Sequence, residues 1–60
     1  MDKTQTIFKD YKTDSIIKRV NGFINLNPGI LVEYDGVLKR TYYSVYNADD
    51  NELIIYCEDN

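Results

Sequence analysis

The chain has 60 residues, of which 43% are hydrophobic and 13% aromatic, and its formal net charge is −3. This length allows a single domain, residues 1–60, and the hydrophobic content is too high for a disordered chain. Histidine is absent and Cys57 is the only cysteine, which excludes an internal disulfide and argues against a zinc site or another bound cofactor.

The N-terminal region is polar, and no apolar segment of the signal-peptide type follows it. No run approaches the roughly 20 apolar residues that a membrane span requires. With a single cysteine, the cytoplasm is the expected compartment. Residues 4–11 can form a short strand that carries Ile7 and Phe8.

Residues 14–26 show two conflicting patterns. Asn21-Gly22 is typical of a hairpin turn, although neither face of such a hairpin would be cleanly apolar. We favour a helix, because burying large apolar side chains outweighs the cost of about 1 kcal/mol for Gly22 in a helix. Thr13 or Asp14 can cap its start, and residues 27–29 can end it. At the helical period, five apolar side chains fall on one face: Ile16, Ile17, Val20, Phe23 and Ile24.

Residues 30–58 have the strongest strand pattern and predict a three-stranded antiparallel meander. Asp35-Gly36 predicts a two-residue type I′ turn, which makes Tyr34 face Val37. The polar residues 47–51 predict a five-residue loop, so that Tyr46 faces Glu52. Because side chains alternate between faces, one face is assigned to the core: Ile30, Val32, Tyr34, Val37, Lys39, Thr41, Tyr43, Val45, Leu53, Ile55 and Cys57.

The predicted fold class is α+β. A three- to four-stranded antiparallel sheet, with its meander at 30–58, has one helix, at about 14–26, packed on one face. A small all-β barrel of five or six strands is the alternative.

Catalytic chemistry has few candidate residues. Without histidine the commonest general acid–base is missing, and Cys57 is assigned to the core face. Residues 47–52 resemble the opening of a calcium loop, but Glu52 stands where that loop needs glycine. We therefore expect no enzymatic activity and no metal.

The second sheet face carries the candidate binding residues. Tyrosine combines a large apolar ring with a polar hydroxyl and is enriched at protein interfaces. A face this apolar is expected to be buried by a second copy or by a partner, or else by the rest of the chain. The candidates on this face are Tyr42, Tyr46, Tyr56, Ile54 and Leu38, and the acidic residues Asp49, Asp50 and Glu52 form a second candidate site.

Most of the acidic excess lies in residues 28–60, which favours a partner with a basic surface. We expect a small acidic protein that forms a homodimer and that binds and modulates or inhibits a larger protein. Size and charge suit an antagonist encoded by a phage or mobile element, acting in the host cytoplasm. The alternative is a module that binds single-stranded nucleic acid through the tyrosine face. The scarcity of basic residues on that face argues against it.

Overall fold

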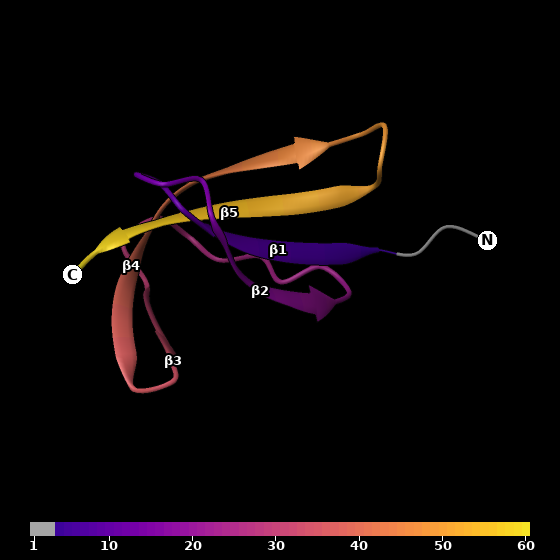
Figure 1. The fold of residues 1–60 in the computed structure, drawn as a ribbon. Helices are drawn as coiled ribbons and strands as arrows, with labels where there is room; N and C mark the ends of the chain where they lie inside the picture. Colours follow the sequence, from indigo (N-terminus) through magenta and orange to yellow (C-terminus); the bar gives the residue numbers. More distant parts are fainter. Residues whose placement is uncertain (1–3) are drawn as a thin grey trace.

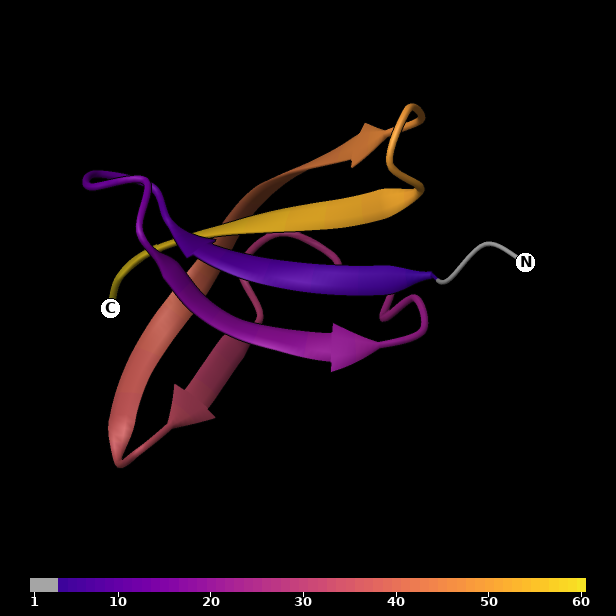
Figure 2. The same ribbon diagram turned by 45° about the vertical axis from the view of Figure 1, so that its right-hand side comes forward.

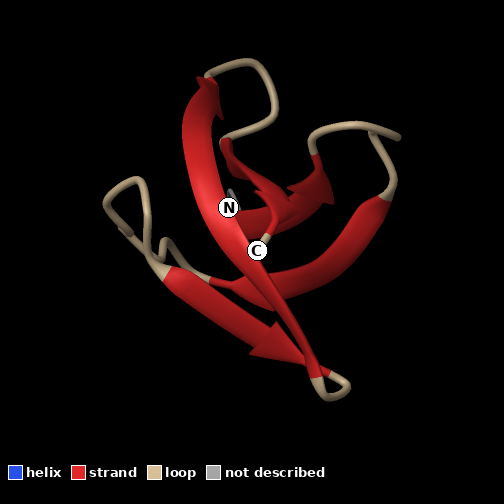
Figure 3. Ribbon diagram, turned by 90° about the vertical axis from the view of Figure 1, so that its left-hand side faces the viewer, coloured by secondary structure: helices blue, strands red, loops and turns tan. Residues whose placement is uncertain are grey.

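The computed structural model describes residues 4–60, and in this range it contains five strands and no helix. Residues 1–3, on which the signal-peptide prediction partly rests, lie outside the described residues. The strands form one sheet in the order β2-β1-β5-β4-β3 (Figure 1). The sheet curls into a half-barrel with β2 and β3 at its edges (Figures 2 and 3). The bounds are Gln5–Asp10 for β1, Ile16–Asn21 for β2, Leu31–Tyr34 for β3, Val37–Asn47 for β4 and Glu52–Asp59 for β5.

The helix predicted at about 14–26 is wrong, and so is the α+β class. The segment forms β2, which pairs antiparallel with β1. The sheet is also mixed, because β1 runs parallel to β5. A register shift in β2 gives the strand one extra residue, so Ile17 and Val20 both pack against the core cluster although they are three residues apart. Because of the bulge, apolar residues three positions apart face the same side of the strand, as they would in a helix, which explains why the sequence pattern favoured a helix. The all-β alternative agrees in class, but the sheet stays open.

The core lies on the concave face, which we define as the side of the sheet that carries Phe8, Ile55 and Cys57. These three side chains are almost fully buried, with exposures of 6%, 0% and 1%. The core position predicted for Cys57 is confirmed, and burial raises the pKa of its thiol. Partly buried side chains surround this cluster: Ile17, Val20, Ile24, Leu26, Val32 and Leu53.

The loop of residues 22–30 covers part of the core, because Ile24 and Leu26 pack against the cluster. Two buried threonines, Thr6 and Thr41, bind its two ends. Each hydroxyl donates to a loop carbonyl and accepts from a loop amide, which leaves neither side chain unsatisfied. The donated bonds reach the carbonyls of Gly22 (2.7 Å) and Asn27 (2.8 Å), and the accepted ones come from the amides of Ile24 and Ile30 (both 2.9 Å).

The predicted strand at 4–11 and the predicted meander are confirmed by β1 and by β3, β4 and β5. The turn between β3 and β4 has positive φ at both Asp35 (49°) and Gly36 (77°), as a type I′ turn requires. Tyr34 pairs with Val37, which confirms the predicted register of this hairpin.

The predicted register between β4 and β5 is only half right. Thr41 pairs with Cys57 as predicted, but Tyr46 pairs with Leu53 and not with Glu52. Asn47 continues β4, and a bulge between Thr41 and Tyr43 absorbs the one-residue difference.

This bulge changes the face of every later residue of β4. Tyr43 and Val45, which were assigned to the core, pair with Tyr56 and Ile54 and lie on the opposite, convex face. Tyr46 follows Leu53 to the concave side. Two further residues assigned to the core, Ile30 and Val37, are 42% and 45% exposed.

Candidate interaction surface

Four tyrosine rings gather on the convex face, and we call them the tyrosine cluster: Tyr11, Tyr42, Tyr43 and Tyr56. The rings of Tyr43 and Tyr56 stack, with centroids 4.8 Å apart and planes at 22°. The edge of Tyr11 meets Tyr42 at 4.8 Å and 75°, and Tyr43 at 6.0 Å and 80°. Offset-stacked and edge-to-face pairs are the favoured arrangements of aromatic rings, so the contacts order one another.

The bulge in β4 explains how two consecutive residues join one cluster. Neighbours in a regular strand point to opposite faces, yet the rings of Tyr42 and Tyr43 lie 5.2 Å apart. The register shift between Thr41 and Tyr43 makes this possible, because a bulge sets two residues of one strand against one residue of the next. The bulge therefore lets β4 place two aromatic rings in this cluster, where a regular strand would place one.

The cluster consists of three exposed rings and one half-buried ring. Tyr11, Tyr42 and Tyr43 are 46%, 43% and 41% exposed, whereas Tyr56 is half-buried. Partial desolvation, followed by the neighbouring phenols, raises the pKa of Tyr43. Its hydroxyl is protonated at neutral pH, as in an ordinary tyrosine, and can both donate and accept a hydrogen bond. On the same face, Val45 is 45% exposed and extends the apolar surface beyond the rings.

Tyr11 lies outside the strands and depends on the turn that follows β1. Its amide donates to the Cys57 carbonyl at 2.7 Å, which fixes the start of the turn to β5. The Asp10 carboxylate accepts the amides of Lys12 (2.8 Å) and Thr13 (3.3 Å), a local bond pattern that stabilises turns. The position of Tyr11 is thus set by backbone contacts on both of its sides.

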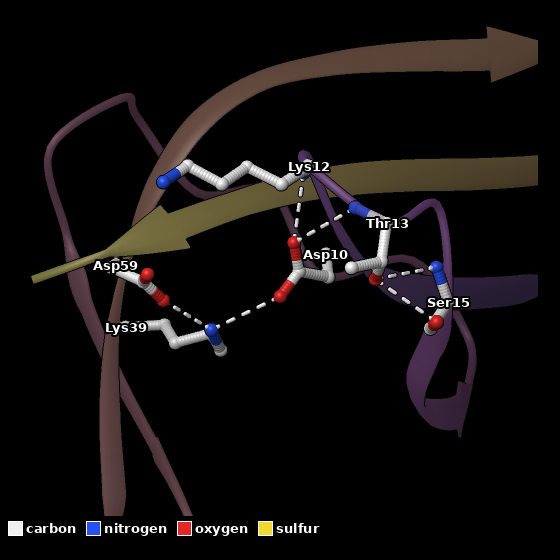
Figure 4. A network of polar contacts seen from close by, with 6 residues as sticks. All are labelled: Asp10, Lys12, Thr13, Ser15, Lys39 and Asp59. Atoms are coloured by element: carbon white, nitrogen blue, oxygen red, sulfur yellow. Dashed lines mark hydrogen bonds and ion pairs between the residues drawn. The ribbon is translucent and has the colours of Figure 1, made fainter.

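A nearly buried lysine supports this turn (Figure 4). Lys39 on β4 lies between two carboxylates, with its Nζ 2.6 Å from Asp59 and 3.1 Å from Asp10. Its side chain is only 11% exposed. The hydrogen bonds that Lys39 donates to Asp59 and Asp10 raise the pKa of Lys39, and the same bonds lower the pKa of both aspartates. All three groups are charged at neutral pH, and Asp10 connects them to the turn that carries Tyr11.

The structure brings together only some of the predicted binding residues. Tyr42 and Tyr56 belong to the tyrosine cluster, and Ile54 lies on the same face, half-buried beside Val45. Tyr46 lies apart from them, so the predicted convergence of the three tyrosines is wrong in this respect. Its ring meets the edge of Phe23 at 5.8 Å and 89°. The face change at the β4 bulge is the cause.

The remaining predicted residues form two separate groups. Leu38, which is 45% exposed, belongs to the hairpin of β3 and β4 and pairs with Glu33. Asp49 and Asp50 are exposed in the loop between β4 and β5. The side chain of Asn47 accepts both of their amides, at 3.1 Å and 3.3 Å, so this acidic loop has a defined shape. Glu52, the first residue of β5, is half-buried.

Sequence reasoning missed Tyr11 and Tyr43 as members of the surface. Tyr43 was missed because regular alternation places it on the face opposite Tyr42, and the pattern gives no sign of the bulge that brings both rings together. Tyr11 had no local signal. It reaches the cluster because β1 pairs in parallel with β5, a contact between the two ends of the chain.

Within residues 4–60, no group of three or more His, Cys, Asp or Glu side chains is placed to hold a metal ion. The same part of the chain has no helix long and apolar enough to cross a membrane. Comparison with protein-family models, curated proteins and solved structures found no match.

Proposed function

We propose that this chain is a small protein-binding module whose tyrosine cluster contacts a larger protein and modulates or inhibits it. One observation carries the proposal: three exposed tyrosine rings share one sheet face with a fourth beneath them. An exposed patch of this kind on a small domain is typical of an interaction site.

The rigidity of the surface supports the same conclusion. Tyrosine has only two side-chain torsions, so little conformational entropy is lost when a ring is fixed by a partner. Here ring–ring contacts already restrict those torsions, and Asp10 and Lys39 restrain the turn that carries Tyr11. Binding to a preorganised surface of this kind has a reduced entropy cost.

Two of the cations around the turn that carries Tyr11 are already paired with carboxylates, which argues against a nucleic-acid partner. Lys9 forms an ion pair with Asp14 at 3.2 Å, and Lys39 is neutralised by two carboxylates. Nucleic-acid affinity arises largely from cations that contact phosphates, and these two are already engaged. The net charge of −3 acts in the same direction.

The test compares Tyr42→Ala with Tyr46→Ala, because both rings are exposed on β4 but lie on opposite faces. The intact chain is used to capture a partner from host lysate, and the captured protein is then purified for affinity measurements. We expect Tyr42→Ala to weaken binding by about thirtyfold through faster dissociation, as for an interface hot spot. Tyr46→Ala should leave the affinity within about twofold of the wild type.

Two outcomes would contradict the proposal. If Tyr42→Ala and Tyr46→Ala both keep the affinity of the wild type, the tyrosine cluster is not part of the binding site. Tight binding of single-stranded DNA or RNA, measured by anisotropy and falling steeply between two salt concentrations, would favour the nucleic-acid function instead. Circular dichroism of each variant separates loss of contact from loss of fold.

A further inference from the structure

The two edges of the sheet are protected differently against pairing with another strand. The β2 edge carries Lys18 and Arg19 together with a bulge, and charges and bulges are devices that discourage edge pairing. The β3 edge carries one charged residue, Glu33, but it has no lysine, no proline and an unbroken register with β4. The hairpin of β3 and β4 extends away from the other strands (Figures 1 and 2). Within residues 4–60, no Cα of β2 lies within 8 Å of one in β3.

The backbone groups on this free edge can be assigned from both ends of β3. The amide of Thr41 donates to the Ile30 carbonyl at 2.8 Å, so Ile30 bonds toward β4. At the other end, the type I′ turn makes Tyr34 bond toward β4 as well. Hydrogen bonding alternates along an antiparallel strand, so the N–H and C=O groups of Leu31 and Glu33 point to the open side. There they have no neighbouring strand in the described part of the chain.

We infer that β3 is a dimerisation edge, and that its occupant is β3 of a second copy of this chain. In antiparallel pairing, a two-fold axis between the two Val32 residues sets Leu31 opposite Glu33 of the second copy. Both residues have outward backbone groups, so each such pair exchanges two hydrogen bonds, and the axis generates the pair twice. The two half-barrels then share one continuous sheet.

The groups beyond the ends of this register are complementary. The turn residue Asp35 of one copy comes near the loop residue Gly29 of the other, and the Gly29 carbonyl accepts a hydrogen bond from Arg40 at 3.0 Å. An acidic residue therefore meets the region of a guanidinium group, again twice across the axis. Tyr34 lies opposite Ile30, whose side chain is 42% exposed. This self-complementarity favours a second copy over an unrelated strand.

Sedimentation velocity on the full chain, from low micromolar to near-millimolar concentration, tests the inference. We expect a monomer–dimer equilibrium in the wild type. Leu31→Lys places a charge at the edge and should weaken dimerisation by at least about tenfold, since symmetry introduces the change twice. Leu38→Lys is the matched control, because Leu38 is similarly exposed on the same hairpin but belongs to an interior strand. It should dimerise within about threefold of the wild type.

A second variant tests the hydrogen bonds directly. Glu33→Pro removes an outward amide without removing a bond to β4, so it should also weaken dimerisation while the domain keeps its circular dichroism spectrum. A wild-type chain that stays monomeric at every concentration would overturn the inference. So would a dimer that Tyr42→Ala dissociates and Leu31→Lys does not, since that dimer would use the tyrosine cluster.

Discussion

Lys39 connects three strands of the fold and also, through Asp10, the turn that carries Tyr11 of the tyrosine cluster. It joins β4 to β1 through Asp10 and to β5 through Asp59, at a place where the sequence pattern assigned a lone charge to an apolar face. A buried ion pair is weak evidence for stability, because desolvation offsets much of the attraction. Its specific contribution here is positional, since Asp10 also shapes the turn that carries Tyr11.

This ion-pair network predicts acid and alkaline sensitivity. Lys39 lowers the folded-state pKa of Asp10 and Asp59, so their contribution to stability is complete above the ordinary value of about 3.9. It is lost as the pH falls through their lowered values. The raised pKa of Lys39 has the opposite sign: its contribution is present below about pH 10.4 and is lost as the pH rises through the folded value. Urea midpoints measured across the pH range should show both losses.

Lys39→Met removes the shared cation, and its urea midpoint should change much less than that of the wild type between about pH 5 and pH 2. Lys9→Met is the control, because the partner of Lys9, Asp14, is 67% exposed and such surface pairs contribute little. If Lys39→Met keeps the full acid sensitivity of the wild type, the two aspartates are not its source.

At the scale of elements, the loop 22–30 covers part of the core, which is the role that was predicted for a helix. It covers apolar side chains of the core, and its polar backbone is bound by Thr6 and Thr41. Thr6 is 0% exposed and Thr41 is 3% exposed, so both hydroxyls are removed from water. A buried backbone group that loses its partner costs about 1–3 kcal/mol.

Thr6→Val and Thr41→Val each keep the side-chain volume and remove two hydrogen bonds to the loop. We expect each substitution to lower the free energy of unfolding by about 1–3 kcal/mol. It should also speed amide exchange at the bound loop end, near residue 24 for Thr6→Val and near residue 30 for Thr41→Val. Thr6→Ser and Thr41→Ser retain the hydroxyl and should retain slow exchange. Fast exchange in the serine variants as well would assign the effect to packing.

Local chemistry was sufficient to predict some elements and not others. Asp35-Gly36 requires a specific turn, so the β3–β4 hairpin and its register followed from two residues. The pairing of Thr41 with Cys57 also followed, but the β4 bulge has no signal in hydrophobic alternation. The faces assigned to Tyr43 and Tyr46 were consequently reversed. For β2, the decisive partner is β1, and a periodicity calculation on one segment contains no information about pairing.

At the scale of the whole molecule, the acidic loop of Asp49 and Asp50 is separate from the uncharged tyrosine cluster, and the two can contribute to binding in different ways. Asp49 and Asp50 are exposed, and exposed charges mainly change the rate at which a partner is encountered. If the partner has a basic surface, Asp49→Lys with Asp50→Lys should slow association by about tenfold and reduce its salt dependence. Stopped-flow or surface-plasmon measurements at two salt concentrations check this. An unchanged association rate would exclude the loop from partner recognition.

The buried apolar cluster of Phe8, Ile55 and Cys57 lies on the concave face, whereas Ile7, which is 4% exposed, pairs with Ile54 on the other side of the sheet. A 60-residue domain is expected to have about 3–9 kcal/mol of stability, at about 0.05–0.15 kcal/mol per residue. Phe8→Ala should cost about 3–5 kcal/mol, which is a large part of that stability. Ile16→Ala, at a side chain that is 46% exposed, should cost less than about 1 kcal/mol.

These two variants should be compared by urea unfolding at one fixed protein concentration, because dimerisation would add a concentration-dependent term. Equal midpoints would mean that the concave cluster is not the dominant core. If Phe8→Ala alone is strongly destabilised, the concave cluster is the dominant core. Tyr42→Ala should be unfolded in the same series, because a midpoint close to that of the wild type allows its effect on binding to be assigned to the contact it removes.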